Sequence, residues 1–200
     1  MNPYDVVRQF EARLCEYTGA KYAVTTNSCT MALLLACAWF KRTQGKAEVC
    51  IPRRTYVSVP MSILHAGHSV IFRQEDWRGS YRLAPLPVWD SARMFTGNMF
   101  SPGQMQCVSF HASKILGDTQ GGAILHDDDV ADKWLRKMRF DGRTEGVAPK
   151  DDTFDCVGFH CYLSNDVAAR LLLKLSVLPR ENAPLPNDDY PELSTMEIFK

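Results

Sequence analysis

The chain of 200 residues has 23 Lys plus Arg and 23 Asp plus Glu, so its formal net charge is zero, and 46% of its residues are hydrophobic. This length and composition fit one domain, or one domain with a tail, that has its own core. Balanced charge argues against a nucleic-acid partner, and the longest apolar run, residues 31–40, is too short to span a membrane. Because polar residues follow Met1, we expect no secretory signal and a cytoplasmic location.

The seven cysteines are irregularly spaced, and no C-x-x-C pair is present. Cys156, His160 and Cys161 lie close together in the sequence. A closed zinc site needs a second pair of ligands, which this cluster lacks. We therefore expect reduced, mostly buried thiols and no metal.

The first third of the chain alternates between helical and strand-like patterns. Apolar residues recur at helical spacing in residues 4–17, and Gly19 is expected to end that helix. Three short apolar segments are expected to be strands: residues 22–25, 48–51 and 69–72. Two helical segments separate them: residues 31–40 and 56–65. This alternation predicts a parallel, doubly wound sheet.

The remainder of the chain continues this pattern after a segment at 73–86 that is rich in charge, Gly and Pro and is expected to be a loop. Further strands are expected at 87–89, 106–110 and 122–125, and further helices at 127–138 and 164–178. We expect residues 1–178 to form a three-layer α/β/α domain with a mostly parallel central sheet. Residues 179–200 turn polar and Pro-rich, which predicts an extended or partly disordered arm.

Polar side chains stand at several expected strand ends, where open α/β sheets bind ligands. Ser28, Cys29 and Thr30 occupy a strand-to-helix turn, where amides and hydroxyls suit a phosphate. Asp90 directly follows the strand at 87–89, where a carboxylate can pair with a cationic heterocycle. Taken alone, each has a simpler interpretation: an N-cap without ligand for the turn, and a capping or salt-bridged aspartate.

Two further segments carry chemistry. In SFHASK, Ser109 ends a strand and Lys114 follows in a loop. A lysine that forms a Schiff base must be mobile and partly neutral, although a solvated loop lysine is the simpler interpretation of this fragment. Gly121 and Gly122 allow close backbone approach. No G-x-G-x-x-G and no P-loop pattern is present, so dinucleotide and P-loop sites are excluded.

Together and in this order, these segments resemble the DegT/DnrJ/EryC1/StrS family of nucleotide-sugar aminotransferases, which have the type I (aspartate-aminotransferase-like) PLP-transferase fold. The resemblance runs from about Phe10 to Leu175, and SFHASK followed by two glycines is its most specific motif. The other segments that carry it are FEARLCEYTGAKYAVTTNSCT, IPRRTYVSVPMSILHAG, VWDSARMF and GFHCYLSND. It implies pyridoxal 5′-phosphate (PLP) as cofactor, a homodimer with a shared active site, and a shortened fold without most of the C-terminal small domain.

By this resemblance, Lys114 forms the Schiff base with PLP and moves the proton between the substrate carbon and the cofactor. Asp90 pairs with the pyridine nitrogen and keeps the ring protonated. Tyr56 stacks on the ring, although a half-buried tyrosine at a helix start would explain it without the resemblance. Hydroxyls and amides of four residues form the phosphate site: Ser109, Ser28, Cys29 and Thr30.

Several positions depart from the family pattern. Arg93 stands where the family has His or Gln at the phenolic oxygen of PLP, and a permanent cation there favours the phenolate. His160 replaces an asparagine that reaches the phosphate of the neighbouring subunit, and Tyr162 replaces an arginine. Cys29 replaces a glycine, so it is strained if that position needs a positive φ. The stretch 72–87 is too short for the strand and helix that the family places there.

The resemblance implies transamination, in which an amino-acid donor such as glutamate becomes 2-oxoglutarate and a keto group on a nucleotide-linked sugar accepts the amine. The main alternative is a non-catalytic PLP-binding remnant with a regulatory or structural role. The missing small domain favours that alternative, and the Lys114–Asp90 pair opposes it. A PLP dehydratase is disfavoured because those relatives have histidine in place of Lys114. An interaction module without cofactor is the remaining alternative.

Overall fold

The structure, a computed structural model, describes residues 4–187 and 189–199. Its helices and strands are α1 (Asp5–Thr18), β1 (Tyr22–Thr26), α2 (Cys29–Gln44), β2 (Glu48–Pro52), α3 (Ser58–His65), β3 (Ser69–Arg73), β4 (Tyr81–Arg82), β5 (Val88–Asp90), β6 (Met105–Ser109), β7 (Gly122–His126), α4 (Asp129–Met138) and α5 (Asn165–Val177). Short 3-10 turns lie at Pro149–Asp151, Leu193–Thr195 and Glu197–Phe199. Each helix and strand predicted from the sequence is present, and β4 lies in a segment that was predicted to be a loop.

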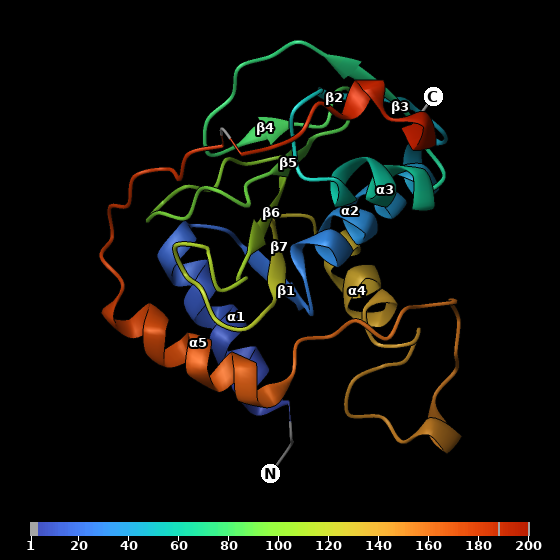
Figure 1. The fold of residues 1–200 in the computed structure, drawn as a ribbon. Helices are drawn as coiled ribbons and strands as arrows, with labels where there is room; N and C mark the ends of the chain where they lie inside the picture. The colour runs from blue at the N-terminus through green and yellow to red at the C-terminus, as the bar shows by residue number, and fades with distance from the viewer. Residues whose placement is uncertain (1–3, 188, 200) are drawn as a thin grey trace.

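The central sheet has five strands in the order β1-β7-β6-β5-β4 (Figure 1). β5 and β6 are parallel, whereas β7 runs antiparallel to β6 and β1, and β4 runs antiparallel to β5. β7 reverses direction because residues 110–121 lead to the neighbouring position without a crossover helix. The predicted α/β class is confirmed, and the sheet is mixed, with β1, β5 and β6 sharing one direction.

β2 and β3 form a separate parallel pair, where the sequence predicted one continuous sheet. A single antiparallel bridge between Cys50 and Ala84 joins this pair to the segment that follows β4. In the same register Pro52 would face Arg82. Because proline has no N–H to donate, the ladder does not extend beyond the bridge in that direction.

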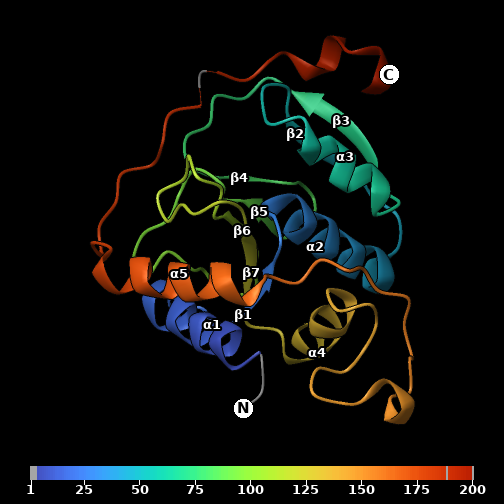
Figure 2. The same cartoon turned by 60° about the horizontal axis from the view of Figure 1, so that its bottom comes forward.

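Two hydrophobic clusters cover the two faces of the central sheet and give the molecule three layers (Figures 1 and 2). α1 packs with α5 on one face, and α2 packs with α3 and α4 on the other. Successive residues of a strand point to opposite faces, so Ala23 belongs to the cluster of α1 and α5, whereas Val24 belongs to that of α2. The predicted three-layer arrangement is therefore confirmed.

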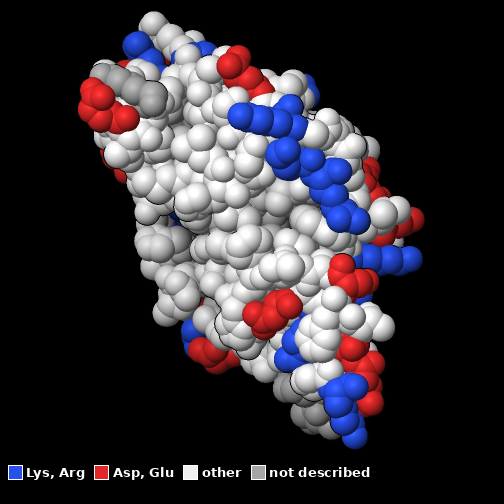
Figure 3. All heavy atoms as spheres, turned by 90° about the vertical axis from the view of Figure 1, so that its right-hand side faces the viewer, with Lys and Arg blue, Asp and Glu red and all other residues white. Residues whose placement is uncertain are grey.

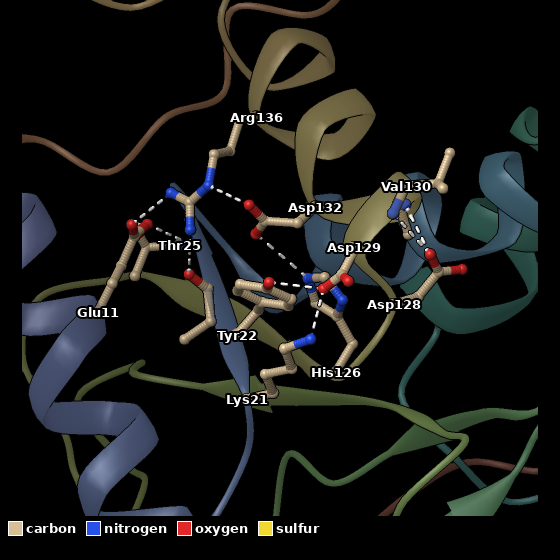
Figure 4. A network of polar contacts seen from close by, with 12 residues as sticks. Glu11, Lys21, Tyr22, Thr25, His126, Asp128, Asp129, Val130, Asp132 and Arg136 are labelled. Carbon is tan, nitrogen blue, oxygen red and sulfur yellow. Dashed lines mark hydrogen bonds and ion pairs between the residues drawn. The ribbon is translucent and has the colours of Figure 1, made fainter.

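A buried ion-pair network ties α1, β1 and α4 together (Figure 4). Glu11 accepts hydrogen bonds from the N–H and hydroxyl of Thr25 at 2.9 and 2.8 Å, and from Arg136 at 2.6 Å. The fully buried Arg139 also donates to Glu11. Burial by itself would raise the pKa of Glu11, but the two arginines hold that pKa below its usual value. The paired charges fix α4 against the sheet, because an unpaired charge here would be strongly destabilising.

The described part of the C-terminal arm, residues 179–187 and 189–199, leaves α5 and crosses the molecule to the side of β2 and β3 (Figures 1 and 2). Its path is held by specific contacts. The N–H of the fully buried Leu193 donates to the carbonyl of Arg53 at 2.8 Å, and the rings of Phe72 and Phe199 meet with centroids 5.9 Å apart. On its way the arm passes over the strand ends. Across the described ranges, every helix is too short or too polar to traverse a lipid bilayer.

Candidate functional site

A cavity of about 330 Å³ lies where the ends of β5 and β6 meet the start of α2. Eight of the nine site residues predicted from the sequence line it: Ser28, Cys29, Thr30, Tyr56, Asp90, Arg93, Ser109 and Lys114. They meet because β1, β5 and β6 share one direction, so their carboxyl ends lie at one edge of the sheet. The ninth, His160, lies outside this cavity, with an exposed imidazole whose Nδ1 is 2.8 Å from Asp141.

Asp90 is the last residue of β5 and is 4% exposed. Its Oδ1 accepts a hydrogen bond from the N–H of Ala92 at 2.9 Å, and its Oδ2 accepts one from the hydroxyl of Tyr81 at 2.8 Å. Burial raises the pKa of this carboxyl, although both hydrogen bonds act in the opposite direction. A cationic group placed beside Asp90 in the cavity would keep the carboxyl ionised.

Lys114 lies in the loop between β6 and β7, where its N–H donates to the carbonyl of His111 at 2.8 Å. Burial and the nearby Arg93 both lower the pKa of the Lys114 ammonium, which enlarges its neutral, nucleophilic fraction. Lys114 acts to lower the pKa of Asp90, and Asp90 acts to raise the pKa of Lys114. Among the described residues, however, no ion pair joins the two side chains, although both line the cavity. The two groups therefore line one cavity with room between them.

The start of α2 forms the third wall. Ser28 caps the helix, its hydroxyl accepting from the N–H of Met31 at 3.3 Å, and the hydroxyl of Thr30 lies 2.8 Å from that of Ser58. An added Cβ at Gly122 would lie 2.5 Å from the backbone nitrogen of Cys29, so β7 approaches the helix too closely for any side chain there. Cys29 itself has no positive φ, and the strain considered for it does not arise. Amides and hydroxyls at such a turn suit a phosphate.

The cavity lining also includes residues that no sequence motif indicated, among them Trp77, Asp189 and Tyr190. Asp189 and Tyr190 belong to the C-terminal arm, and the ring of Tyr190 stacks on Trp77 with centroids 6.0 Å apart. Arg93 donates to the Tyr190 hydroxyl at 2.8 Å, to Asp189 at 2.5 Å and to the carbonyl of Pro186. In the sequence, the only sign of this group was that Trp77 and Tyr190 are aromatic residues in polar surroundings.

The cavity can thus hold a ligand that combines an anionic group, a basic ring and a carbonyl carbon. An anionic group would suit the start of α2, a basic ring would suit Asp90, and a carbonyl carbon would suit Lys114, because these groups line one cavity. Among the described residues, no group of three or more His, Cys, Asp or Glu is placed to hold a metal ion.

Comparison with known proteins gives matches in sequence and in structure. The model of the DegT/DnrJ/EryC1/StrS aminotransferase family matches residues 1–78 and 96–184. The spore coat polysaccharide biosynthesis protein SpsC of Bacillus subtilis (strain 168) is 39% identical over 70 residues, which are 35% of this chain and 18% of SpsC.

Among solved structures, the sugar aminotransferase CalS13 from Micromonospora echinospora has a TM-score of 0.74 at 20% identity, over 86% of this chain and 60% of CalS13. DesI, solved in the presence of its TDP-sugar product, has a TM-score of 0.66 at 24% identity, over 87% of this chain and 53% of DesI. These likenesses show the fold. The chain spans little more than half the length of either structure.

The two matched segments leave out residues 79–95, which contain Asp90 and Arg93. The position of Asp90 at the cavity therefore follows from the geometry of β5, whose pairing with β6 brings Asp90 opposite Cys107, two residues before Ser109. Arg93 and the arm residues that it contacts also lie outside the two matched segments.

Proposed function

The chain belongs to the DegT/DnrJ/EryC1/StrS aminotransferase family, and we propose that its cavity binds PLP and that it transfers an amino group to a keto sugar. The observation that carries this proposal is that Lys114, Asp90 and the start of α2 line one cavity. PLP, when bound, supplies an electron sink that stabilises negative charge on the carbon being aminated. The cavity volume of about 330 Å³ is in the usual range for a small-molecule site.

The polar groups of the cavity fit this cofactor. The buried Asp90 has a raised pKa that a protonated pyridine nitrogen would lower, so ring and carboxylate would stabilise each other's charge. The lowered pKa of Lys114 favours the neutral amine that bonds to an aldehyde carbon. Its Nζ would then hold the proton that leaves and returns to the substrate carbon.

The remaining predicted residues would position the cofactor. The hydroxyls of Ser28, Thr30 and Ser109, with the amide of Cys29, would hold the phosphate at the start of α2. Tyr56, which lines the same cavity and is 57% exposed, would stack on the ring. Arg93 would favour an ionised phenolic oxygen if that oxygen lies beside it.

For the substrates, we propose a nucleotide-linked keto sugar as acceptor and glutamate as donor, with 2-oxoglutarate as the product of the donor. Family membership supports an aminotransferase. The similarity to CalS13, described as a sugar aminotransferase, and to DesI, which was solved with a TDP-sugar product, supports a sugar acceptor.

We also propose a homodimer in which His160 reaches the phosphate site of the partner. His160 lies outside the cavity of its own chain, and the loop that leads to it exposes Phe154, Val157 and Phe159. The side of the molecule that includes α3 has a broad area without charged side chains (Figure 3). Exposed apolar side chains and an area without charge are typical of an interface.

A half-reaction tests the function. The PLP-loaded chain is mixed with glutamate, and the absorbance of the cofactor is followed as PLP becomes pyridoxamine phosphate. We expect complete conversion, and none with Lys114→Ala. For the alternative, a PLP-binding remnant without catalysis, the structure adds a second observation to the missing small domain: the arm places Asp189 and Tyr190 at the cavity. PLP that binds to Lys114 but never converts would establish that alternative.

A further inference from the structure

The guanidinium of Arg93 lines the cavity together with Lys114, but its hydrogen bonds lead to the C-terminal arm. The Arg93 side chain is 12% exposed, whereas that of its ionic partner Asp189 is 67% exposed. A partly buried cation is thus neutralised by a carboxylate that stays largely in water. Because water and salt screen an exposed charge, Asp189 is a weak counterion for Arg93.

The contact between these two residues is also incomplete. Arg93 donates to one oxygen of Asp189, at 2.5 Å, while its other bonds go to the hydroxyl of Tyr190 and the carbonyl of Pro186. A guanidinium has five N–H donors and prefers to bind both oxygens of a carboxylate at once. A free carboxylate that enters the cavity can therefore offer Arg93 a better partner than Asp189 does.

The position of Arg93 suits an amino-acid ligand. Arg93 and Lys114 line the same cavity, and the charge of Arg93 contributes to the lowered pKa of Lys114. A ligand carboxylate bound at Arg93 would hold the ligand's amine or carbon chain on the Lys114 side of the cavity. It would also remove the repulsion between Arg93 and Lys114.

We propose that Arg93 is the group that binds a carboxylate of the amino-acid donor, and that Asp189 occupies this place in the free protein and is displaced by the donor. This inference rests on the proposed function, since it takes the ligand to be an amino acid. Arg93 would then be a specificity-determining residue. The carboxylate of Asp189, held near Arg93 by the arm, would compete with the donor for the same place.

Glutarate is a suitable probe, because it has two carboxylates and neither an amine nor a ketone that could react with PLP. Its affinity is measured by isothermal titration calorimetry on the full chain. Asp189→Asn should bind glutarate about two- to fivefold more tightly, the range of an exposed ion pair. Arg93→Gln should bind it at least about tenfold more weakly, because the charged partner is lost.

Two controls make the result specific. Glu181→Gln removes an equal charge from the same arm at an exposed position outside the cavity lining, and it should leave the affinity unchanged. The neutral diamide of glutarate should not bind. Unchanged glutarate affinity in Asp189→Asn would overturn the competitor role, and unchanged affinity in Arg93→Gln would overturn the carboxylate site.

A second readout uses Trp77, whose ring stacks on Tyr190 next to Asp189. Glutarate should change the tryptophan fluorescence of the wild type, and Trp77→Phe should remove that change. The titrations are performed with and without bound PLP, so they decide the carboxylate site even if PLP fails to attach to Lys114. Attachment of PLP without a glutarate effect would refute this inference and leave the proposed function intact.

Discussion

The hydroxyl of Tyr81 donates a hydrogen bond of 2.8 Å to Oδ2 of Asp90, and the two residues face each other across the β4–β5 pair. Both side chains are buried, and the hydroxyl of Thr55 lies 2.5 Å from that of Tyr81. β4 is only two residues long, yet it fixes the orientation of the Asp90 carboxyl. Tyr81 is therefore a positioning residue that acts through Asp90.

Tyr81→Phe should weaken PLP binding about fivefold, because a single hydrogen bond contributes about 1 kcal/mol. The loss of this bond raises the pKa of Asp90, which already lies above its usual value. PLP binding that needs an ionised Asp90 should therefore be lost at a higher pH on acidification than in the wild type. Equilibrium binding of PLP across the pH range tests this shift. Tyr22→Phe, whose hydroxyl contacts Asp129 on the surface, is the matched control.

Asp90→Asn keeps the size of the side chain and removes its charge. We expect the half-reaction with glutamate to slow by about 100-fold, the loss typical of an electrostatic stabiliser in an active site. The covalent attachment of PLP to Lys114 should persist, so the variant separates catalysis from attachment. Stopped-flow absorbance gives the rate. A rate equal to that of the wild type would show that Asp90 has no role in the reaction.

Gly122→Ala should disturb both stability and the phosphate site, because its Cβ would lie 2.5 Å from the backbone nitrogen of Cys29. We expect a loss of about 1–3 kcal/mol in the free energy of unfolding, as for other overpacked positions, together with weaker PLP binding. Gly45→Ala is the control: it adds strain at a φ of 87°, its Cβ would have nothing within 4 Å, and Gly45 does not line the cavity. It should lower stability while PLP affinity stays unchanged.

Glu11→Gln should lower the free energy of unfolding by about 1–3 kcal/mol near neutral pH, because the buried Arg139 would lose the charge of Glu11 and keep only Glu145 as its carboxylate partner. The pKa of Glu11 is depressed in the folded state, so its contribution is complete above the unfolded-state pKa. That contribution is lost as the pH falls through the folded-state pKa. Urea unfolding at neutral and acidic pH should show the difference between wild type and variant shrinking on acidification.

The sequence was informative where local pattern determines structure. Lys114 and Asp90 were predicted to meet because both follow strands that end at the same edge of a sheet, and the structure places both at one cavity. Ser28 was predicted to cap a helix, and it does so. These outcomes depend on short-range periodicity and on the general topology of α/β sheets.

Long-range contacts determine what the sequence did not reveal. β4 exists because Tyr81 and Arg82 pair with β5, and two residues carry no periodic signal of their own. The arm reaches the cavity through Arg93, 96 residues before Asp189. The one bridge that joins β2 and β3 to the segment after β4 likewise depends on a neighbour, Ala84, that lies far along the chain from Cys50.

The covalent bond between PLP and Lys114 is the central claim, and borohydride reduction followed by peptide mass spectrometry tests it most directly. The chain is incubated with PLP, reduced, digested and mapped. The account predicts one pyridoxyl phosphate group on the peptide that contains Lys114 and none in Lys114→Ala. A label on a different lysine, or no label on the folded wild-type chain, would contradict it.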